Sequence, residues 1–242
     1  MPESSSVVTE PRSTPYFTPG PLLAQGRAAD VFEYGEGLVL RRYRTDHDCV
    51  YEAAVMQHVR AHGYPAPEVV AVAGRDLVME RIEGQTMLRD IGRRPWRLYR
   101  HASTLAALQQ GLHDIPAPEW LQTKHEGGTA VVHLDLHPDN VMLAPTGPVV
   151  IDWSNAGRGD PDVEVADLWL VMSSATVPGS RMDRVIANLG RGLFVSAILR
   201  HFDRDAIRAK LAIARSARSR DRNMSAAEIG RMNDLVRKYG TG

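Results

Sequence analysis

The sequence predicts an α+β protein in two parts: a small antiparallel sheet with one helix, followed by a larger, mostly helical part. Up to residue 82, short apolar runs alternate with turns that contain glycine, which is typical of antiparallel strands. Beyond residue 82, leucine and alanine recur at helical spacing over long segments. With 242 residues, 43% of them hydrophobic, the chain is long enough for two small lobes with packed cores.

The first part begins with a polar tail and continues as strands and one helix. Residues 1–15 are rich in Ser, Pro and Thr and are expected to be disordered. The elements expected next are a strand, a turn with Gly26 and a strand within 16–32, a strand at 38–43, a helix at 48–62, and strands at 68–72 and 77–79. The last of these strands ends three residues before position 82, where the pattern of short apolar runs stops.

The second part is predicted to contain long helices. Residues 95–113 carry leucine and alanine at helical spacing, and Pro116 and Pro118 follow. An apolar helix is expected to open at Asp167. Further helices are expected at 180–202, 203–218 and 225–239, the last with a capping box of Ser225 and Glu228.

The most informative segment is 131–153, which reads as a β-hairpin with polar residues at its open end. Two apolar runs, 141–143 and 149–151, flank an insert with two prolines and a glycine. If Val141 pairs with Ile151, Asn140 lies opposite Asp152. An amide oxygen beside a carboxylate is a ligand pair suited to Mg²⁺. Asp135 precedes the hairpin and can act as a base that accepts a hydroxyl proton.

These residues carry a resemblance to a known family. The order His-x-Asp-x-His-Pro-x-Asn over 133–140, followed by Ile-Asp-Trp at 151–153, resembles the aminoglycoside phosphotransferase family of small-molecule kinases. The resemblance implies a protein-kinase-like bilobal fold. The segment 79–84 resembles the family's hinge, which implies a nucleotide-binding lobe over residues 16–82 and a helical catalytic and substrate-binding lobe over residues 83–242. It also implies phosphorylation of a hydroxyl on a small molecule, aminoglycoside-like or another metabolite. The cofactors implied are Mg²⁺ and ATP, with GTP as an open alternative.

The same resemblance implies roles for individual residues. Asp135 is the catalytic base, and Asn140 and Asp152 hold the metal. Arg41 stands where the family has a lysine that grips the α- and β-phosphates, and Glu52 would orient it. Further roles fall to Gly26 in the phosphate loop, to the backbone of Glu80 and Ile82 at the adenine edge, and to His133, His137, Asp160 and Asp167 as supporting residues.

Other functions compete with this prediction. The arginine at position 41 and the glycine-poor loop leave open a nucleotide-binding regulator with a weak or absent catalytic activity. A protein kinase is disfavoured because no Ala-Pro-Glu segment follows the hairpin. A zinc site of His133, Asp135 and His137 is disfavoured because Pro138 argues against a helix there.

The composition and charge of the chain limit which binding partners and which cellular compartment we expect. Lys plus Arg and Asp plus Glu number 29 each, which argues against a nucleic-acid-binding protein. A single cysteine, Cys49, excludes an intrachain disulfide and fits the cytoplasm. No apolar run of roughly 18 residues occurs, so no membrane span is expected. The oligomeric state cannot be read from the sequence.

Two charged clusters have two interpretations each. Asp160, Asp162 and Glu164 could meet the ammonium groups of an aminoglycoside, or they could form a solvated turn. The arginines at 215, 218, 220 and 222 could form a nucleic-acid patch, but a solvated helix face is favoured because no aromatic residues are interleaved.

Overall fold

The computed structural model describes residues 17–241 except 27, 46, 175–180 and 220–223, and it does not describe the side chains of 181–187. The predicted tail at 1–15, the start of the predicted helix at 180 and two arginines of the basic run, Arg220 and Arg222, lie outside the described residues. Contacts between Cα atoms divide the chain into two compact units. The first comprises residues up to Ala53 and Glu68–Arg81, and the second comprises Ala54–Pro67 and Ile82–Gly242.

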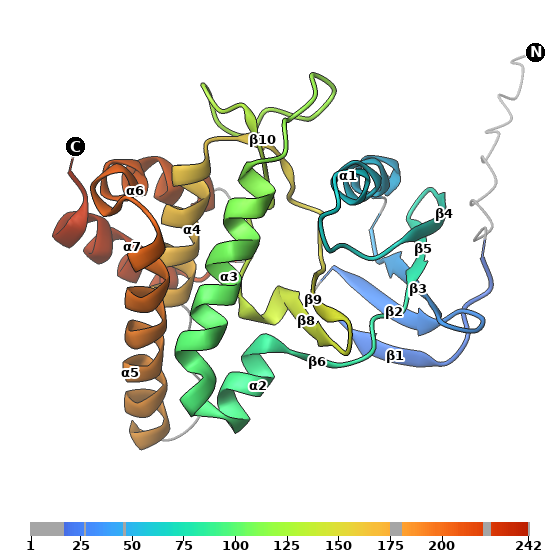
Figure 1. The fold of residues 1–242 in the computed structure, drawn as a ribbon, viewed down its shortest axis with the longest axis horizontal. Helices are drawn as coiled ribbons and strands as arrows, with labels where there is room; N and C mark the ends of the chain where they lie inside the picture. Colours follow the sequence, from blue (N-terminus) through green and yellow to red (C-terminus); the bar gives the residue numbers. More distant parts are fainter. Residues whose placement is uncertain (1–16, 27, 46, 175–180, 220–223, 242) are drawn as a thin grey trace, which may run out of the picture. The chain divides into compact units, whose positions relative to one another are not determined.

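The first unit is built on a five-stranded antiparallel sheet (Figure 1). Its strands lie in the order β1-β2-β3-β5-β4, so β3 is central. The prediction of a strand at 38–43 is confirmed residue for residue. The strand bounds are β1 Leu22–Gln25, β2 Ala29–Glu33, β3 Leu38–Tyr43, β4 Val69–Ala73 and β5 Asp76–Glu80.

The central strand β3 directs its two arginines to opposite faces, as alternation requires. Arg41 lies on the same face as Tyr43, and both contact Glu52. Arg42 instead pairs with Asp76 at the start of β5. Glu52 comes from helix α1, Val50–Ala61, whose first residues belong to the first unit and whose remainder belongs to the second. The predicted lobe boundary placed the whole helix in the first lobe.

Gly84 follows the first unit and begins a short stretch that pairs with the hairpin. Its φ is +146°, and a Cβ at this position would lie 2.3 Å from the Leu143 carbonyl oxygen. Both facts require glycine here. The next residues form β6, Gln85–Thr86, and α2, Met87–Arg93, where Thr86 caps the helix by accepting the Arg89 amide proton. Neither element was expected from the sequence.

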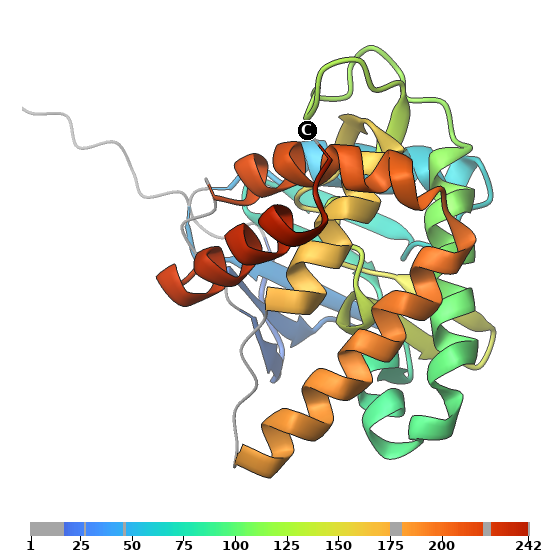
Figure 2. The ribbon, with the colours of Figure 1, turned by 90° about the vertical axis from the view of Figure 1, so that its left-hand side faces the viewer.

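The second unit is mostly helical, as predicted. Helix α4 packs against α5, α6 and α7, and α3 packs against α5 (Figures 1 and 2). Buried residues of α4, α5, α6 and α7 form one apolar cluster that includes Trp169, Leu170, Ile207 and Met232. The predicted capping box of Ser225 and Glu228 is present. The helix bounds are α3 Leu98–His113, α4 Pro161–Ser174, α5 Arg181–Ile198, α6 Arg204–Arg218 and α7 Ala226–Tyr239, with 3-10 turns η1 Pro95–Arg97, η2 Pro138–Asn140 and η3 Leu199–His201.

Two small sheets position the loop of the second unit that contains Asp135. Strands β7 and β10 pair antiparallel on one side of it. On the other side, β8 and β9 form the predicted hairpin, and β6 pairs with β8. Their bounds are β7 Ala130–Val132, β8 Val141–Ala144, β9 Gly147–Val150 and β10 Gly157–Gly159.

The register of the hairpin differs from the prediction by one residue. Val141 pairs with Val150, not with Ile151, and Ala144 pairs with Gly147. The loop therefore has only two residues, and the glycine that closes it has a φ of +131°. The backbone of Asn140 consequently faces Ile151, and its carbonyl oxygen accepts a hydrogen bond from the Ile151 amide. The expectation that Asn140 lies directly opposite Asp152 in the ladder is wrong.

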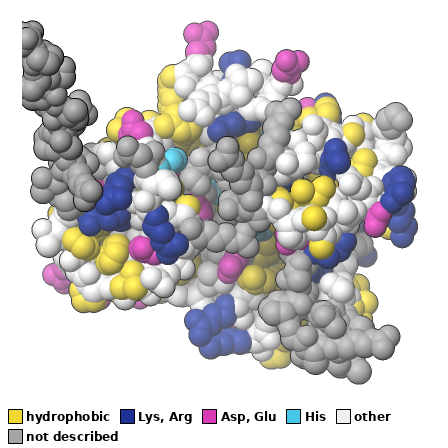
Figure 3. All heavy atoms as spheres, turned by 180° about the vertical axis from the view of Figure 1, so that it is seen from behind, with side chains coloured by type: hydrophobic (Ala, Val, Ile, Leu, Met, Phe, Trp, Pro, Cys, Tyr) yellow, Lys and Arg dark blue, Asp and Glu magenta, His cyan; other side chains and the backbone are white. Residues whose placement is uncertain are grey.

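The surface carries charges of both signs. On the face drawn in Figure 3, lysine and arginine side chains are interspersed with aspartate and glutamate. In the described part of the chain, no helix is both long enough and apolar enough to cross a membrane. Cys49 is fully buried, as expected for a small hydrophobic residue.

Candidate active site

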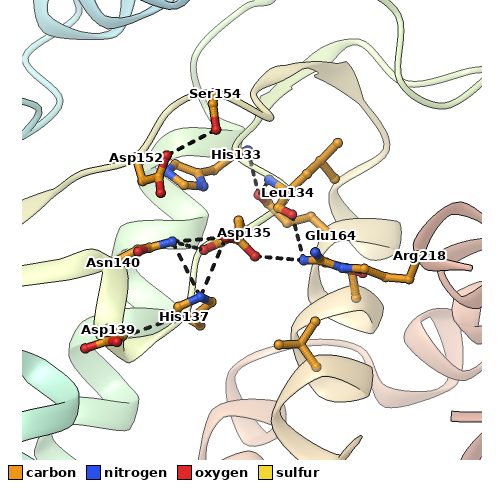
Figure 4. Close-up of polar contacts among 12 residues, drawn as sticks. His133, Leu134, Asp135, His137, Asp139, Asn140, Asp152, Ser154, Glu164 and Arg218 are labelled. Carbon is orange, nitrogen blue, oxygen red and sulfur yellow. Dashed lines mark hydrogen bonds and ion pairs between the residues drawn. The ribbon is translucent and has the colours of Figure 1, made fainter. Parts of the chain in front are cut away.

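The loop at 133–137 is held in a strained conformation by its neighbours. Leu134 has a φ of +60°, which is uncommon for a residue with a branched side chain. Its amide and that of His133 both donate to Oε1 of Glu164, at 2.6 Å each (Figure 4). Strain of this kind costs on the order of 1–3 kcal/mol and persists only where surrounding contacts hold it. Glu164 supplies such contacts.

Glu164 is a buried carboxylate, only 1% exposed, that connects α4 to two other segments. Its Oε2 lies 2.5 Å from Nε2 of His113 at the end of α3. Burial on its own raises the pKa of Glu164, but the hydrogen bonds from His113 and from the Leu134 amide outweigh it and hold the pKa below its ordinary value. The residue therefore stays ionised and can accept all three hydrogen bonds.

His133 is fully buried beneath the loop. Its Nε2 lies 3.1 Å from the Ile151 carbonyl oxygen, and its ring packs edge-on against Trp153, with centroids 4.7 Å apart. Burial lowers the pKa of His133, so the neutral ring donates to Ile151. These contacts join the loop to the strand end that leads to Asp152.

Asp135 is a half-buried carboxylate at the tip of this arrangement, with 23% of its side chain accessible. Oδ1 accepts a hydrogen bond from Arg218 at 2.9 Å, and Oδ2 accepts one from the Asn140 amide at 3.2 Å. Nε2 of His137 lies 3.6 Å from Oδ2. Burial tends to raise the pKa of Asp135, but His137 and Arg218 together hold it well below its usual range.

Asn140 and Asp152 are the two residues that the sequence predicts to bind Mg²⁺. The amide nitrogen of Asn140 donates to the backbone oxygen and to Oδ2 of Asp135, so its Oδ1 must face the other way. In Figure 4 the Asp152 carboxylate extends toward this side of Asn140. Asp152 has a φ of +65°, which turns its side chain out of the strand direction. In that view the two side chains lie near each other, although they do not pair in the ladder.

The two predicted ligands, Asn140 and Asp152, would suit a metal ion that a nucleotide also binds. Among the described residues, no group of three or more His, Cys, Asp or Glu side chains is arranged to hold a metal. One amide oxygen and one carboxylate leave most of the coordination shell of Mg²⁺ to phosphate oxygens and water, which is its usual binding mode.

The first unit contains the predicted pair of Arg41 and Glu52. Nη1 of Arg41 donates to Oε1 of Glu52 at 2.9 Å, and the Tyr43 hydroxyl donates to Oε2 at 2.7 Å. The Arg41 guanidinium also lies 4.9 Å from the Tyr43 ring centroid. Glu52 thus orients Arg41 as the resemblance implied, with a tyrosine as an additional partner.

The remaining predicted nucleotide contacts lie at turns and strand ends. Gly26 follows β1, and its amide donates to the Ala29 carbonyl. Glu80 ends β5, where its side chain accepts the Glu68 amide proton. Ile82 is the first residue of the second unit after the sheet. Their contacts with a nucleotide remain a prediction.

The acidic residues of α4 have different partners from those expected. Asp160 caps the helix by accepting the Asp162 amide proton, and it forms an ion pair with Lys210 at 2.7 Å. Glu164, one turn before the predicted supporting residue Asp167, is the residue that accepts hydrogen bonds from the loop amides. Neither Asp160 nor Glu164 is therefore a free carboxylate for a substrate ammonium group.

Asp167 instead pairs with Arg218, through two hydrogen bonds of 2.8 Å. Burial raises the pKa of Asp167 to about 6, and the carboxylates of Asp135 and Glu164 add to this effect against the attraction of Arg218. The expectation that the run 215–222 is a solvated face is wrong for Arg218, whose side chain is only 13% exposed. Sequence reasoning named Glu164 and Arg218 in two charged clusters but did not connect either residue to the loop, because neither belongs to the local motif.

Comparison with known proteins agrees with this geometry. The model of a family described as "Phosphotransferase enzyme family" matches residues 21–127 and 112–209. A thiamine kinase of Salmonella paratyphi B is 39% identical over 59 residues, and one of Salmonella heidelberg is 44% identical over 41 residues. These segments cover 24% and 17% of this chain, and 19% and 15% of the two kinases.

Solved structures share the fold over nearly the whole chain. Aminoglycoside phosphotransferase APH(4)-Ia superposes with a TM-score of 0.63 at 17% identity, covering 92% of this chain and 94% of that one. A choline/ethanolamine kinase family protein from Mesorhizobium loti superposes with a TM-score of 0.53 at 17% identity, covering 91% and 88%. The fold is thus protein-kinase-like, and because the family model matches well over half of the residues, the chain belongs to the phosphotransferase enzyme family.

Proposed function

We propose that this protein transfers the γ-phosphoryl group of ATP to a hydroxyl of a small molecule, with Mg²⁺ bound by Asn140 and Asp152. The observation that carries the proposal is the orientation of Asn140. Its amide nitrogen is committed to Asp135, so its oxygen is left for a cation beside Asp152. One side chain thereby links the base to the metal position.

The chain's residues would then divide the work of an in-line transfer. The acceptor hydroxyl donates its proton to Asp135 while its oxygen bonds to the γ-phosphorus, and the bond to the β-phosphate oxygen breaks to release ADP. Mg²⁺, when bound, neutralises charge on the β- and γ-phosphates. Because Asp135 has a low pKa, it acts mainly by orienting the hydroxyl and accepts the proton late.

The first unit would supply nucleotide contacts. Arg41, held by Glu52, would grip the α- and β-phosphates, since a guanidinium can donate two hydrogen bonds to phosphate oxygens. Gly26 would let the turn backbone approach the phosphates. Backbone groups of Glu80 and Ile82 would bind the adenine edge. An ATP requirement fits the cytoplasmic location that the sequence led us to expect.

The substrate class is tested by a panel of hydroxyl compounds. The panel comprises thiamine, choline, ethanolamine and hygromycin B. These are the small molecules that the names of the similar proteins and complexes contain. Purified protein, Mg-ATP and each compound would be assayed for ADP release and for the phosphorylated product. Acceptor-dependent ADP release supports the proposal.

A nucleotide-binding regulator is the alternative, and the arginine at the lysine position favours it. Calorimetric binding of Mg-ATP without acceptor-dependent ADP release across the panel would favour the regulator. Absence of nucleotide binding would contradict both functions.

A further inference from the structure

Arg218 connects the last turn of α6 to the loop that contains the proposed base. It lies beyond residues 21–209, to which the family model extends. Its guanidinium makes two hydrogen bonds to Asp167. It also donates to the Leu134 carbonyl at 2.9 Å and to Oδ1 of Asp135 at 2.9 Å (Figure 4). A single side chain therefore joins α4, α6 and the loop.

The contacts with Arg218 complete the restraint of Asp135. Asn140 binds Oδ2 and Arg218 binds Oδ1, so rotation of the carboxylate about its Cβ–Cγ bond would break at least one hydrogen bond. The strained Leu134 is held on both sides of its backbone, with its amide on Glu164 and its carbonyl on Arg218. The direction of the Asp135 side chain is thus set by groups from two different helices.

The bidentate pair with Asp167 makes this restraint rigid. Two parallel hydrogen bonds fix the plane of the guanidinium. The two hydrogens of Nη2 are shared among Asp167, the Leu134 carbonyl and Asp135, all within 2.9 Å. A lysine ammonium is a point charge without a planar fork, so it can hold one carboxylate but cannot reproduce all of these contacts at once.

We propose that Arg218 is a positioning residue that aims the Asp135 carboxylate at the acceptor hydroxyl. This inference rests on the proposed phosphotransferase function. In this role Arg218 acts through Asp135 and the Leu134 backbone. It offsets the charges of Asp135 and Asp167, two carboxylates that burial would otherwise leave uncompensated.

The kinetic test compares Arg218→Ala and Arg218→Lys with Arg215→Ala. Arg215 lies on the same helix and bonds to Asn233, away from the loop, so it is a matched control. The probe is thiamine or, if thiamine is not turned over, the panel compound with the fastest wild-type rate. We expect Arg218→Ala to lower kcat by roughly 30-fold or more while KM for ATP stays within about threefold. Arg218→Lys should recover only a small part of the rate, and Arg215→Ala should stay near wild type.

Chemical rescue separates positioning from a structural role. Millimolar guanidinium should restore part of the Arg218→Ala rate, whereas ammonium at equal ionic strength should not, because only the planar cation fits between the two carboxylates. A folded Arg218→Ala protein with wild-type kcat would overturn the inference. So would a loss of kcat that both cations restore equally.

A double-mutant cycle tests the contact without any substrate. Unfolding in urea is measured for wild type, Asp135→Ala, Arg218→Ala and the double variant. We expect the equilibrium constant for unfolding of the double variant to differ by about tenfold from the value that the two single variants would give if their effects were independent. Additive effects would overturn the inference. An inactive wild-type protein would count against the proposed function alone, because the cycle is read without turnover.

Discussion

At the scale of single residues, the site depends on the difference between an exposed carboxylate and a buried one. Asp135 is partly accessible and reaches outward, whereas Glu164 is enclosed and binds only the protein. Both carboxylates are ionised, but their environments differ. Asp135 can contact a substrate, whereas Glu164 holds the loop that contains Asp135. Substitutions at the two positions should therefore affect different measurements.

Asp135→Ala should abolish turnover while nucleotide binding is kept. A correctly placed base contributes about 10²- to 10⁴-fold, so kcat should fall within or beyond that range. The affinity for Mg-ATP, measured by calorimetry, should change by less than about threefold, because Asp135 is not expected to touch the nucleotide. Near wild-type turnover would show that another group is the base.

Glu164→Gln should destabilise the protein in a pH-dependent manner. The glutamine can still accept amide protons but loses the charge, so we expect a loss of about 1–3 kcal/mol at pH 7 in urea unfolding. Because the folded protein holds the pKa of Glu164 below 4.5, the wild type has its full advantage above that pH and loses it as the pH falls further. The gap between variant and wild type should narrow below pH 4.5; a gap that widens would contradict the assignment.

The residues of the site that could be predicted are those within a local pattern. Asp135, Asn140 and Asp152 lie in one short segment, and Arg41 and Glu52 follow from a strand and the next helix. Glu164 and Arg218 contact the same loop but are 30 and 84 residues from Leu134 along the chain. Their roles depend on how helices pack, which a one-dimensional pattern does not encode.

At the scale of elements, the strand pairing of the β8–β9 hairpin differs from the prediction by one position. Its existence was predicted from two apolar runs and an insert with turn residues, but the loop proved to have two residues. Side chains in a strand alternate, so a shift by one would reverse their faces. Asp152 has a left-handed backbone with a φ of +65°, so it does not continue the strand conformation of β9. A positive φ at an aspartate cannot be read from the sequence.

Gly84→Ala should cost much more stability than the same change in an open helix. At Gly84 the new Cβ would meet the Leu143 carbonyl in an unfavourable backbone conformation, and we expect a loss of at least about 1–3 kcal/mol. Gly230→Ala in α7 is the control, since nothing lies near its Cβ and alanine favours helix by about 0.5–1 kcal/mol. Urea unfolding measures both, and equal effects would refute the close approach at residue 84.

At the scale of the whole molecule, ligand binding should appear as stabilisation. A nucleotide analogue such as AMP-PNP with Mg²⁺ binds only the folded chain, so at 100 times its Kd it should add about 2.7 kcal/mol and raise Tm. Chelation of Mg²⁺ should remove most of the shift. Asp152→Asn should abolish the magnesium-dependent part, since asparagine tolerates the same backbone conformation but lacks the charge.

Asp139→Asn is the control for that measurement. Asp139 is an exposed carboxylate of the same loop, beside Asn140 in sequence. It should keep the full magnesium-dependent shift in Tm. A shift lost equally in both variants would mean that general charge, and not a metal ligand at 152, is responsible.

The overall architecture could be predicted because strands and long helices differ in the period of their apolar residues. The sheet, α1, α3 and the C-terminal helices lie within a few residues of their predicted ranges. The short elements α2, β7 and β10 were not assigned, because three to seven residues with glycines carry little periodicity.

The attachment of the loop to α6 also has a consequence for the order in which the site is made. Translation is directional, and Asp135 is synthesised 83 residues before Arg218. A nascent chain on the ribosome can therefore close its sheet and hairpin while the carboxylate at 135 is still held on one side only. The site would acquire its final geometry only after α6 has left the exit tunnel, so incomplete translation products would carry the motif without its alignment.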